Sequence, residues 1–375
     1  MASVVTTEWN RQRELRRALA RREHFGTLAD GTTIEAVVLE AGGLRARIIT
    51  YGATLQSLQV PDSAAQMVDV VLGYDTLEDY VEFPEFFGVT VGRYANRIAG
   101  GVFALQGRAY CIPANNGCNA LHGGPQGFDK HAWRIVAVED GEAAAVTMEL
   151  ASPDGDQGFP GNLVARVTYR LDRTGTLTIG MTATTDAPTI VNLTNHSFFN
   201  LAGAGGTASA LDHVLTIPAE YFAPVDEGLI PTGELRAVAG TPFDFRAGRI
   251  IGDGVRDGHD AQIAIGRGYD HSFALAGGVT AEPKLAARLS DPCSGRYLEL
   301  FTTDPALQVY SGNFLDGTRR GKGGRFYRMG DGIALEPQKF PDTPNKPEFG
   351  SARLDPGETY RHRIVIRLVG AIVRY

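Results

Sequence analysis

The feature that most restricts the fold of this chain is a long alternation of apolar and polar residues on both sides of a turn. In residues 163–171 every second side chain is apolar, and the same alternation resumes over residues 177–183. The segment between them, Asp172-Arg173-Thr174-Gly175, ends in a glycine. Period two on both sides of a glycine-containing turn predicts a β-hairpin with one buried face.

Short strands of this kind recur along the rest of the chain, separated by turn residues. The 46 glycines and 19 prolines suit a turn-rich sheet protein. Amphipathic helices are nearly absent after residue 25, and no alternation of strand and helix indicates a parallel sheet. We therefore predict an all-β fold, either antiparallel sheets packed face to face or a barrel. The further predicted strands are 34–39, 44–50, 54–60, 69–73, 86–92, 102–112, 133–139, 145–151, 189–200, 213–218, 284–290, 296–303, 307–314, 332–336 and 363–369.

The domain organisation is predicted to be simple. Residues 8–24 resemble a polar helix with Trp9, Leu15 and Leu19 as its sizeable apolar residues, so residues 1–24 form a helical extension. This extension either lies on the body or contacts a partner or an anionic surface. Residues 25–375 contain no linker, repeat or low-complexity tract and are expected to form one domain.

Charge and cysteine content exclude several classes of protein. The net charge is −7; six arginines and three glutamates give residues 1–24 a charge of +3, which leaves −10 on the remainder. An acidic body does not suit nucleic-acid binding. The three cysteines are too few and scattered for a disulfide framework and are expected to be reduced. No apolar run approaches a membrane span and no signal peptide is evident, so we expect a cytoplasmic protein.

Two segments far apart in the sequence carry residues that could transfer protons. His196 lies in NLTNHSFFNLAG at 192–203, between apolar residues at the end of a predicted strand. Glu336 lies in ALEPQKFPDTPN at 334–345, where burying a carboxylate without a purpose would be costly. A histidine can gain or lose a proton near neutral pH. Together these residues predict acid–base chemistry on a bound substrate.

Five further polar residues lie at predicted strand ends. A sugar carries hydroxyl groups around its ring, and planar side chains that form paired hydrogen bonds suit such a ligand. Each residue also has a structural interpretation: a turn histidine, one half of an ion pair, a local Asp–His contact or an ordinary strand residue. Only their occurrence together favours a sugar site. The five are Asn96, Arg97, His122, Asp270 and Gln308.

These segments, taken in order, resemble the galactose mutarotase (aldose 1-epimerase) family from about residue 25 to about residue 370. The resemblance implies a galactose-mutarotase-like β-sandwich, the supersandwich, with an open sugar cleft. It implies interconversion of the α and β anomers of free aldohexoses without metal, nucleotide or other cofactor. The motifs that carry it are GRYANRI, LHGG, NLTNHSFFNLAG, TPFDFR, GYDHSF, QVYSGN, ALEPQKFPDTPN and PGETYRHR.

Carried over by motif, Glu336 would be the general base and His196 the general acid. His122 would polarise the ring oxygen or hold the sugar. The other implied substrate-binding residues are Asn96, Arg97, Asp270 and Gln308, with Ser197 and Phe198 beside the acid. The chain departs from the family where Phe198 replaces a common tyrosine and Ser272 a common asparagine, which puts the preferred sugar in question. We expect Glu336 to be ionised and His196 protonated, with Asp270 favouring the imidazolium.

Other functions compete with this interpretation. Asp270 and Glu336 could be the carboxyl pair of a glycoside hydrolase. His122, His196 and His271 with a carboxylate could bind a metal, although no HxH or HExxH spacing supports this. A sugar-binding or regulatory module without activity is a third alternative. A sugar-phosphate epimerase would need a cluster of Arg and Lys, which the motifs lack. The expected partner is a free monosaccharide, without nucleic acid or membrane, for a monomer or homodimer.

Overall fold

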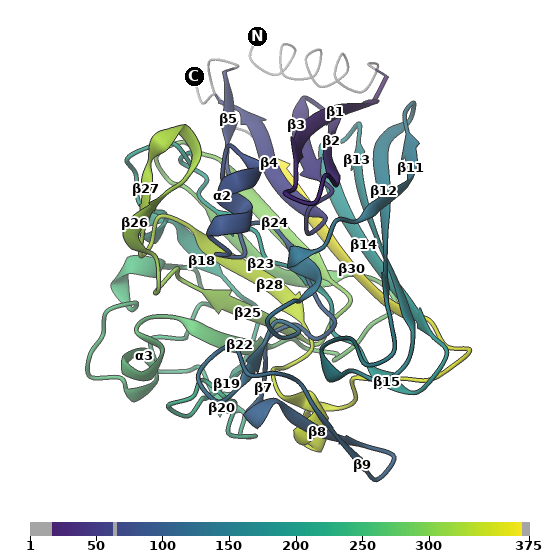
Figure 1. Ribbon diagram of the computed structural model, residues 1–375. Helices are drawn as coiled ribbons and strands as arrows, with labels where there is room; N and C mark the ends of the chain where they lie inside the picture. Colours follow the sequence, from purple (N-terminus) through teal and green to yellow (C-terminus); the bar gives the residue numbers. More distant parts are fainter. Residues whose placement is uncertain (1–16, 63–65, 370–375) are drawn as a thin grey trace.

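The computed structural model describes residues 17–62 and 66–369, and most of its regular structure is β-strand (Figure 1). The largest sheet has nine strands, all paired antiparallel. In spatial order these are β11 (Arg134–Glu139), β12 (Ala143–Ser152), β13 (Leu163–Asp172), β14 (Thr176–Thr185), β30 (Tyr360–Val369), β24 (Tyr297–Thr302), β23 (Lys284–Ser290), β18 (Val214–Thr216) and β21 (Arg249–Ile250).

Two smaller antiparallel sheets complete the body. The six-stranded sheet carries most of the residues singled out by the sequence; its order is β17 (Phe198–Phe199), β28 (Ile333–Gln338), β25 (Ala306–Tyr310), β22 (Asp270–Ala274), β19 (Tyr221–Ala223) and β20 (Arg236–Ala237). The five-stranded sheet is a meander of β1 (Leu19–Thr27), β2 (Thr33–Ala41), β3 (Leu44–Ile49), β4 (Thr54–Pro61) and β5 (Met67–Asp69).

Short paired segments connect these sheets. The pairs are β6 (Thr90–Val91) with β16 (Thr194–Asn195), β7 (Arg97–Ile98) with β10 (Ala120–Leu121), β8 (Val102–Leu105) with β9 (Arg108–Cys111), β15 (Thr189–Ile190) with β29 (Arg353–Leu354), and β26 (Asp316–Arg320) with β27 (Phe326–Arg328). Within residues 17–62 and 66–369 the helices are α2 (Leu77–Glu82), α3 (Ala261–Gly266) and eight 3₁₀ turns at Ala99–Gly101, Phe128–Lys130, Asp156–Gly158, Ala210–Asp212, Ile251–Asp253, Lys322–Gly324, Thr343–Asn345 and Pro347–Phe349. Neither α-helix in the described ranges has the length or apolar character to cross a membrane.

The predicted hairpin at 163–183 is confirmed. β13 and β14 pair antiparallel from Leu163 opposite Thr185 to Leu171 opposite Leu177. The apolar members of the alternation are almost fully buried in the main hydrophobic core. This core joins residues of all three large sheets, and it holds the six-stranded sheet against the nine-stranded one.

The six-stranded sheet has one apolar face and one polar face. Ile333 and Leu335 of β28, like Leu307 and Val309 of β25, belong to the main core. Because successive side chains of a strand point to opposite faces, the residues between them lie on the other face. Glu336 and Gln308 are on that polar face, directly opposite one another in the pairing of β28 with β25. The alternation therefore places one face of this sheet against the core, while the other face carries the polar residues of the candidate site.

Several sequence-based boundaries were wrong. The predicted strand 189–200 is three two-residue strands, and 102–112 is a hairpin. Most of 86–92 is irregular. The strands β19 to β22, β26 and β27 were missed because they are short and carry weak alternation. Such short segments become strands by pairing with neighbouring strands, so tertiary contacts rather than the local pattern decide their conformation.

The N-terminal helix predicted over residues 8–24 does not extend to residue 24. Residues 8–16 lie outside the described part of the chain. From Leu19 the chain forms β1, which pairs with β2, and this sheet pairing overrides the weak helical pattern. Leu19, expected to be an apolar anchor, is about half exposed at 51%.

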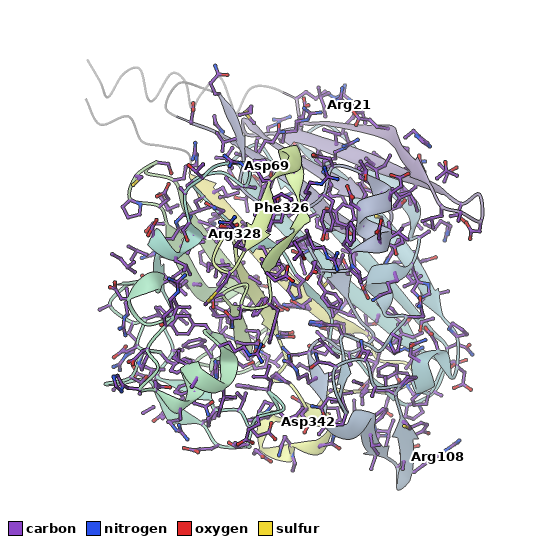
Figure 2. All side chains as sticks on the ribbon, turned by 60° about the vertical axis from the view of Figure 1, so that its left-hand side comes forward. Arg21, Asp69, Arg108, Phe326, Arg328 and Asp342 are labelled. Carbon is purple, nitrogen blue, oxygen red and sulfur yellow. The ribbon has the colours of Figure 1, made fainter. Side chains whose placement is uncertain are left out.

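Two hairpins lie outside the main layers. The β26–β27 hairpin, which carries Phe326 and Arg328 in Figure 2, lies near Asp69 of β5. The buried Lys322 between its strands donates to Asp69 Oδ2 at 2.8 Å and to the Val71 carbonyl at 2.9 Å. The β8–β9 hairpin, with Arg108 at its end, projects from the opposite end of the molecule (Figures 1 and 2).

Candidate active site

The two predicted proton-transferring residues meet on the polar face of the six-stranded sheet. His196 Nε2 lies 3.5 Å from Glu336 Oε1. Phe198 of β17 pairs antiparallel with Ala334 of β28, so His196, two residues before Phe198, comes opposite Glu336, two residues after Ala334. Both side chains are nearly buried, with 6% and 2% of their surface exposed. Two titratable side chains from segments 140 residues apart in the sequence are thus next to one another, as predicted.

Polar side chains before His196 fix this segment against the strand that carries Glu336. Asn192 donates to the carbonyl of Ala95 at 3.0 Å and accepts from the backbone N–H of Lys339 at 2.9 Å. Thr194 donates to the carbonyl of Pro337, the residue after Glu336, at 2.6 Å. The polar residues of the NLTNH motif therefore position the acid–base pair.

His122 and Asn96 are held together by their backbones. The backbone N–H of Asn96 donates to His122 Nδ1 at 3.1 Å, and that of His122 donates to the Asn96 carbonyl. This leaves His122 Nε2 free of the backbone contact. Both residues have positive φ, 68° for Asn96 and 52° for His122. Such conformations cost on the order of 1–3 kcal/mol and concentrate at functional sites.

The LHGG glycines permit this arrangement. At Gly123, with φ of 88°, an added Cβ would lie 2.0 Å from the Gly92 carbonyl oxygen. Only glycine fits there, because the contact is with backbone that cannot move aside. The motif brings the His122 loop against the GRYANRI segment.

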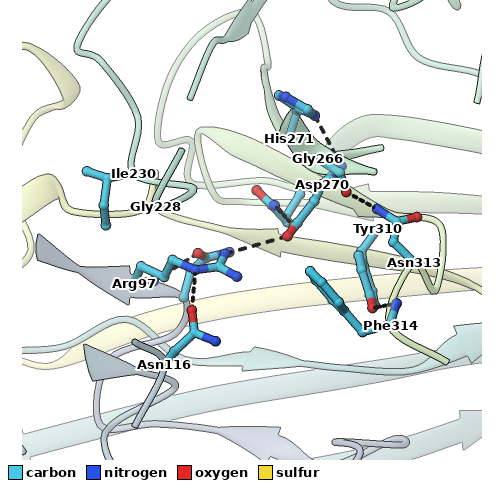
Figure 3. Close-up of polar contacts among 12 residues, drawn as sticks. Arg97, Asn116, Gly228, Ile230, Gly266, Asp270, His271, Tyr310, Asn313 and Phe314 are labelled. Carbon is cyan, nitrogen blue, oxygen red and sulfur yellow. Dashed lines mark hydrogen bonds and ion pairs between the residues drawn. The ribbon is translucent and has the colours of Figure 1, made fainter. Parts of the chain in front are cut away.

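A series of polar contacts runs across the same face of the sheet, and it includes Gln308, the register partner of Glu336. Ser272 donates to Gln308 Oε1 at 2.5 Å, and Gln308 Nε2 donates to Asp270 Oδ1 at 2.6 Å. Arg97 NH1 from β7 lies 3.6 Å from Asp270 Oδ2 (Figure 3). All four side chains are at least nine-tenths buried. Their hydrogen-bonding groups are therefore pre-oriented.

Two residues next to this series of polar contacts were not predicted from the sequence. Asn116 accepts a hydrogen bond from Arg97 Nε at 3.0 Å and so fixes the guanidinium from the other side (Figure 3). Tyr310 is opposite Asp270 in the pairing of β22 with β25, and its hydroxyl accepts from the Phe314 backbone N–H at 2.9 Å. The tyrosine lies within QVYSGN and could have been selected by period two from Gln308. Asn116 lies in an irregular loop without such a signal.

Ser197 and Phe198 lie beside the histidine but are turned away from the polar chain. The Ser197 hydroxyl donates to Asn195 Oδ1 at 2.6 Å. The Phe198 ring stacks on His196, with ring centroids 5.0 Å apart, and is 1% exposed. Phe198 thus packs against the His196 ring and Ser197 bonds to Asn195, while substrate contact by these two residues stays a prediction.

Burial determines the charge states of the pair. It lowers the pKa of His196 to about 4. Burial also raises the pKa of Glu336 well above its ordinary value; Asp270 raises it further, while Arg97 opposes the shift. Burial therefore disfavours the charged form of both groups, the imidazolium of His196 and the carboxylate of Glu336. The expected ionised Glu336 and charged His196 are not favoured, because desolvation penalises both charges. Asp270 acts on Glu336 instead of stabilising an imidazolium.

His122 belongs to the same cluster. Its ring is 5.2 Å from the ring of His196, and burial lowers its pKa well below the ordinary value, with the charges of His196, Arg97 and Lys130 adding to the effect. One potential ligand atom each from His122, His196 and Glu336 lie within 4.8 Å of one another. Two imidazoles and a carboxylate are a set that Zn²⁺ accepts. The set considered from the sequence included His271, which instead contacts Phe243 and Gln262 on the apolar side.

Comparisons with known proteins agree with this geometry. The family model described as aldose 1-epimerase matches residues 35–367. The galactose mutarotase of Bos taurus is 45% identical over 342 residues, which cover 91% of this chain and 96% of that protein. The aldose 1-epimerase of Escherichia coli (strain K12) is 42% identical over 320 residues, covering 85% and 90%. A crystal structure of galactose 1-epimerase from Lactobacillus acidophilus NCFM superposes with a TM-score of 0.83 at 32% identity, covering 94% of this chain and 99% of that one. This chain belongs to the aldose 1-epimerase family.

Proposed function

We propose that this protein interconverts the α and β anomers of free aldohexoses, with Glu336 as general base and His196 as general acid. The observation that carries the proposal is the contact of 3.5 Å between His196 Nε2 and Glu336 Oε1 on the polar face of the sheet. Family membership supports the same reaction. Asn96, Arg97, His122, Asp270 and Gln308 supply the surrounding donors and acceptors for the sugar hydroxyls.

The reaction opens and recloses the hemiacetal ring. Glu336 accepts the proton of the O1 hydroxyl while His196 donates a proton to the ring oxygen O5, and the C1–O5 bond breaks to give the aldehyde. Rotation about C1–C2 and the reverse transfers close the ring on the other face. O1 and O5 share one carbon and are therefore close together, so two groups 3.5 Å apart can each reach one of them. The protons balance over the cycle.

The neutral resting pair is compatible with these roles. A protonated Glu336 with a neutral His196 holds the same single proton as an ionised Glu336 with a charged His196. Sugar hydroxyls that donate to the carboxylate, together with Arg97, favour the second form once substrate is bound. The pair as a whole, rather than either residue, then sets the pH dependence.

The simplest test of the function is polarimetry on freshly dissolved α-glucose, α-galactose and an α-pentose. An accelerated approach to rotational equilibrium supports the proposal, and the three rates rank the sugars. An aryl glycoside in the same preparation distinguishes the hydrolase alternative, because release of the phenol would require Asp270 and Glu336 to act as a glycosidase pair. A sugar-binding module without activity would change neither signal. The preferred aldose, cytoplasmic location and monomeric or dimeric state stay predictions.

The pH profile should be broad, with the one-proton state of the pair as the active state. Because the pKa of His196 is lowered to about 4, the pair gains a second proton only near pH 4, and kcat/KM should fall below that pH. Because the pKa of Glu336 is raised, the pair loses its proton only well above the ordinary carboxyl range, and kcat/KM should fall again on the alkaline side. Polarimetric rates, corrected for the rate in buffer alone, would show this. A single inflection near pH 6.5, as for an exposed histidine, would contradict it.

Replacement of Arg97 by alanine should raise KM by at least about tenfold with a smaller change in kcat. Arg97 contacts Asp270 and Asn116, so its loss should mainly weaken sugar binding. The smaller change in kcat follows from the loss of a positive charge that favours the ionised Glu336. Arg97→Lys keeps the charge but not the hydrogen bonding on two sides, so its KM should lie between those of wild type and Arg97→Ala. Anomer-exchange NMR at several galactose concentrations separates the two constants. An unchanged KM for Arg97→Ala would remove this residue from the binding site.

A further inference from the structure

The His196 ring lies between two phenylalanine rings. The Phe86 centroid is 5.7 Å away with an interplanar angle of 24°, and the Phe198 centroid is 5.0 Å away at 28°. Both contacts are stacked. The edge of His122 approaches the same ring at 5.2 Å. The imidazole is therefore in contact with three aromatic rings, two of which stack on it.

No hydrogen bond fixes the orientation of this ring from behind. His196 Nδ1 is buried and has no hydrogen-bond partner among the described residues. Histidines used in proton transfer or metal binding are usually oriented by a hydrogen bond at the second nitrogen. Here the direction of Nε2 toward Glu336 must come from ring packing and from the backbone bonds of His196 to Val89 and Gly88.

Phe86 is itself held in an unusual position. Its φ is 60°, a conformation that a bulky residue adopts only when its surroundings enforce it. The Lys130 ammonium lies 5.3 Å from the centroid of its ring and pairs with Asp129 at 2.6 Å. A small cavity lined by Tyr51, Tyr74, Phe83 and others adjoins Phe86. The Phe86 ring thus packs against His122 and His196, although the adjoining cavity offers space on its other side.

Phe198 forms the fixed side of the enclosure. Its ring packs edge-on against Phe87 at 5.1 Å and Tyr310 at 5.7 Å. It is 1% exposed, while Phe86 is only partly buried. The two rings differ accordingly: Phe198 belongs to the packed interior, and Phe86 closes the site from the loop before β6.

We propose that Phe86 is a positioning residue which, with Phe198, clamps the His196 imidazole so that Nε2 faces Glu336. This inference rests on the proposed role of His196 as general acid. Besides orienting the ring, the clamp keeps water from it. The π faces also interact favourably with the imidazolium that forms during the cycle. Phe86 thus acts on the reaction through His196, without touching the reacting atoms.

The test compares Phe86→Leu with Phe86→Tyr and with Phe83→Leu. Phe83→Leu is a matched control: it makes the same change in the same loop, on a ring that contacts Tyr74 and not the histidines. Phe86→Leu should lower kcat by about 10- to 100-fold with KM within about threefold, since a misplacement near 1 Å costs up to about 10²-fold. Phe86→Tyr, which keeps the aromatic ring, and the control Phe83→Leu should both have a kcat close to that of wild type. Circular dichroism and Tm verify that each variant is folded.

An NMR titration provides a readout independent of activity. With His196 assigned by comparison with His196→Asn, its pKa in Phe86→Leu should rise toward the ordinary value, because water reaches the ring. In Phe83→Leu it should stay at the wild-type value. Wild-type kcat and an unshifted His196 pKa in Phe86→Leu would overturn the clamp, and so would a large rise in KM at constant kcat. If His196→Asn keeps wild-type activity, the acid assignment fails instead, while the titration still tests the clamp.

Discussion

Glu336→Gln is expected to lower kcat by at least about two orders of magnitude while leaving KM for galactose within a fewfold of wild type. A positioned acid or base contributes about 10²–10⁴-fold, or roughly 3–5.5 kcal/mol of barrier. Glutamine preserves the shape and can still hydrogen-bond to O1, but it cannot take up the proton. Polarimetry and anomer-exchange NMR would give both constants. A near-normal rate would reject Glu336 as the base.

This substitution should not unfold the protein, which makes the result easy to interpret. The folded-state pKa of Glu336 is raised, which means that the fold binds the carboxylate form less favourably than the neutral form; above the ordinary carboxyl pKa this difference destabilises the fold. Glutamine resembles the neutral carboxyl and removes that penalty. The Tm of Glu336→Gln should equal or exceed that of wild type at pH 7, and the difference should shrink below the ordinary carboxyl pKa. The control is Glu85→Gln, which changes a half-buried carboxyl whose pKa is also raised and should keep wild-type kcat.

His196→Asn should reduce kcat by a similar factor, about 10²-fold or more, because no group remains to exchange a proton with O5. Unlike the Glu336 variant, it should also lose stability, since asparagine leaves part of the space between Phe86 and Phe198 empty. The alkaline limb of any residual activity should then report Glu336 alone.

The control for the histidine variant is His259→Asn, which changes an exposed histidine outside the site. Its kcat and Tm should match those of wild type. His196→Gln, which fills more of the space, should recover stability but not rate. Recovery of rate in His196→Gln would show that His196 acts by packing alone.

The sequence predicted the chemistry of the site better than its environment. The hairpin at 163–183 and the contact of His196 with Glu336 followed from alternation and from motifs, which are local signals. The neutral state of the pair did not follow, because it depends on how much protein surrounds each group. Phe86 was inside a predicted strand and gave no sign of its positive φ, since only packing against Lys130 and the histidines requires that conformation.

The misjudged elements share one physical cause. β1 was predicted as helix and 189–200 as one strand, because isolated periodicity was used where partners from distant segments decide the structure. Asn192 and Thr194 illustrate this: they bond to the backbones of Ala95, Lys339 and Pro337, residues that are near only in the folded chain. These contacts interrupt the regular strand and thereby fix the direction of the side chain that follows.

The two-sided strands of the six-stranded sheet have an evolutionary consequence. Ser272 and Gln308 can be exchanged for other polar residues without disturbing Phe273 or Leu307, which face the interior one position away. Substitutions on the polar face can therefore change the candidate sugar site while the residues of the hydrophobic core stay the same. A one-residue insertion in β25 or β28 would exchange the two faces of the strand. Gln308 or Glu336 would then point into the hydrophobic core, and an aliphatic side chain would point into the candidate sugar site.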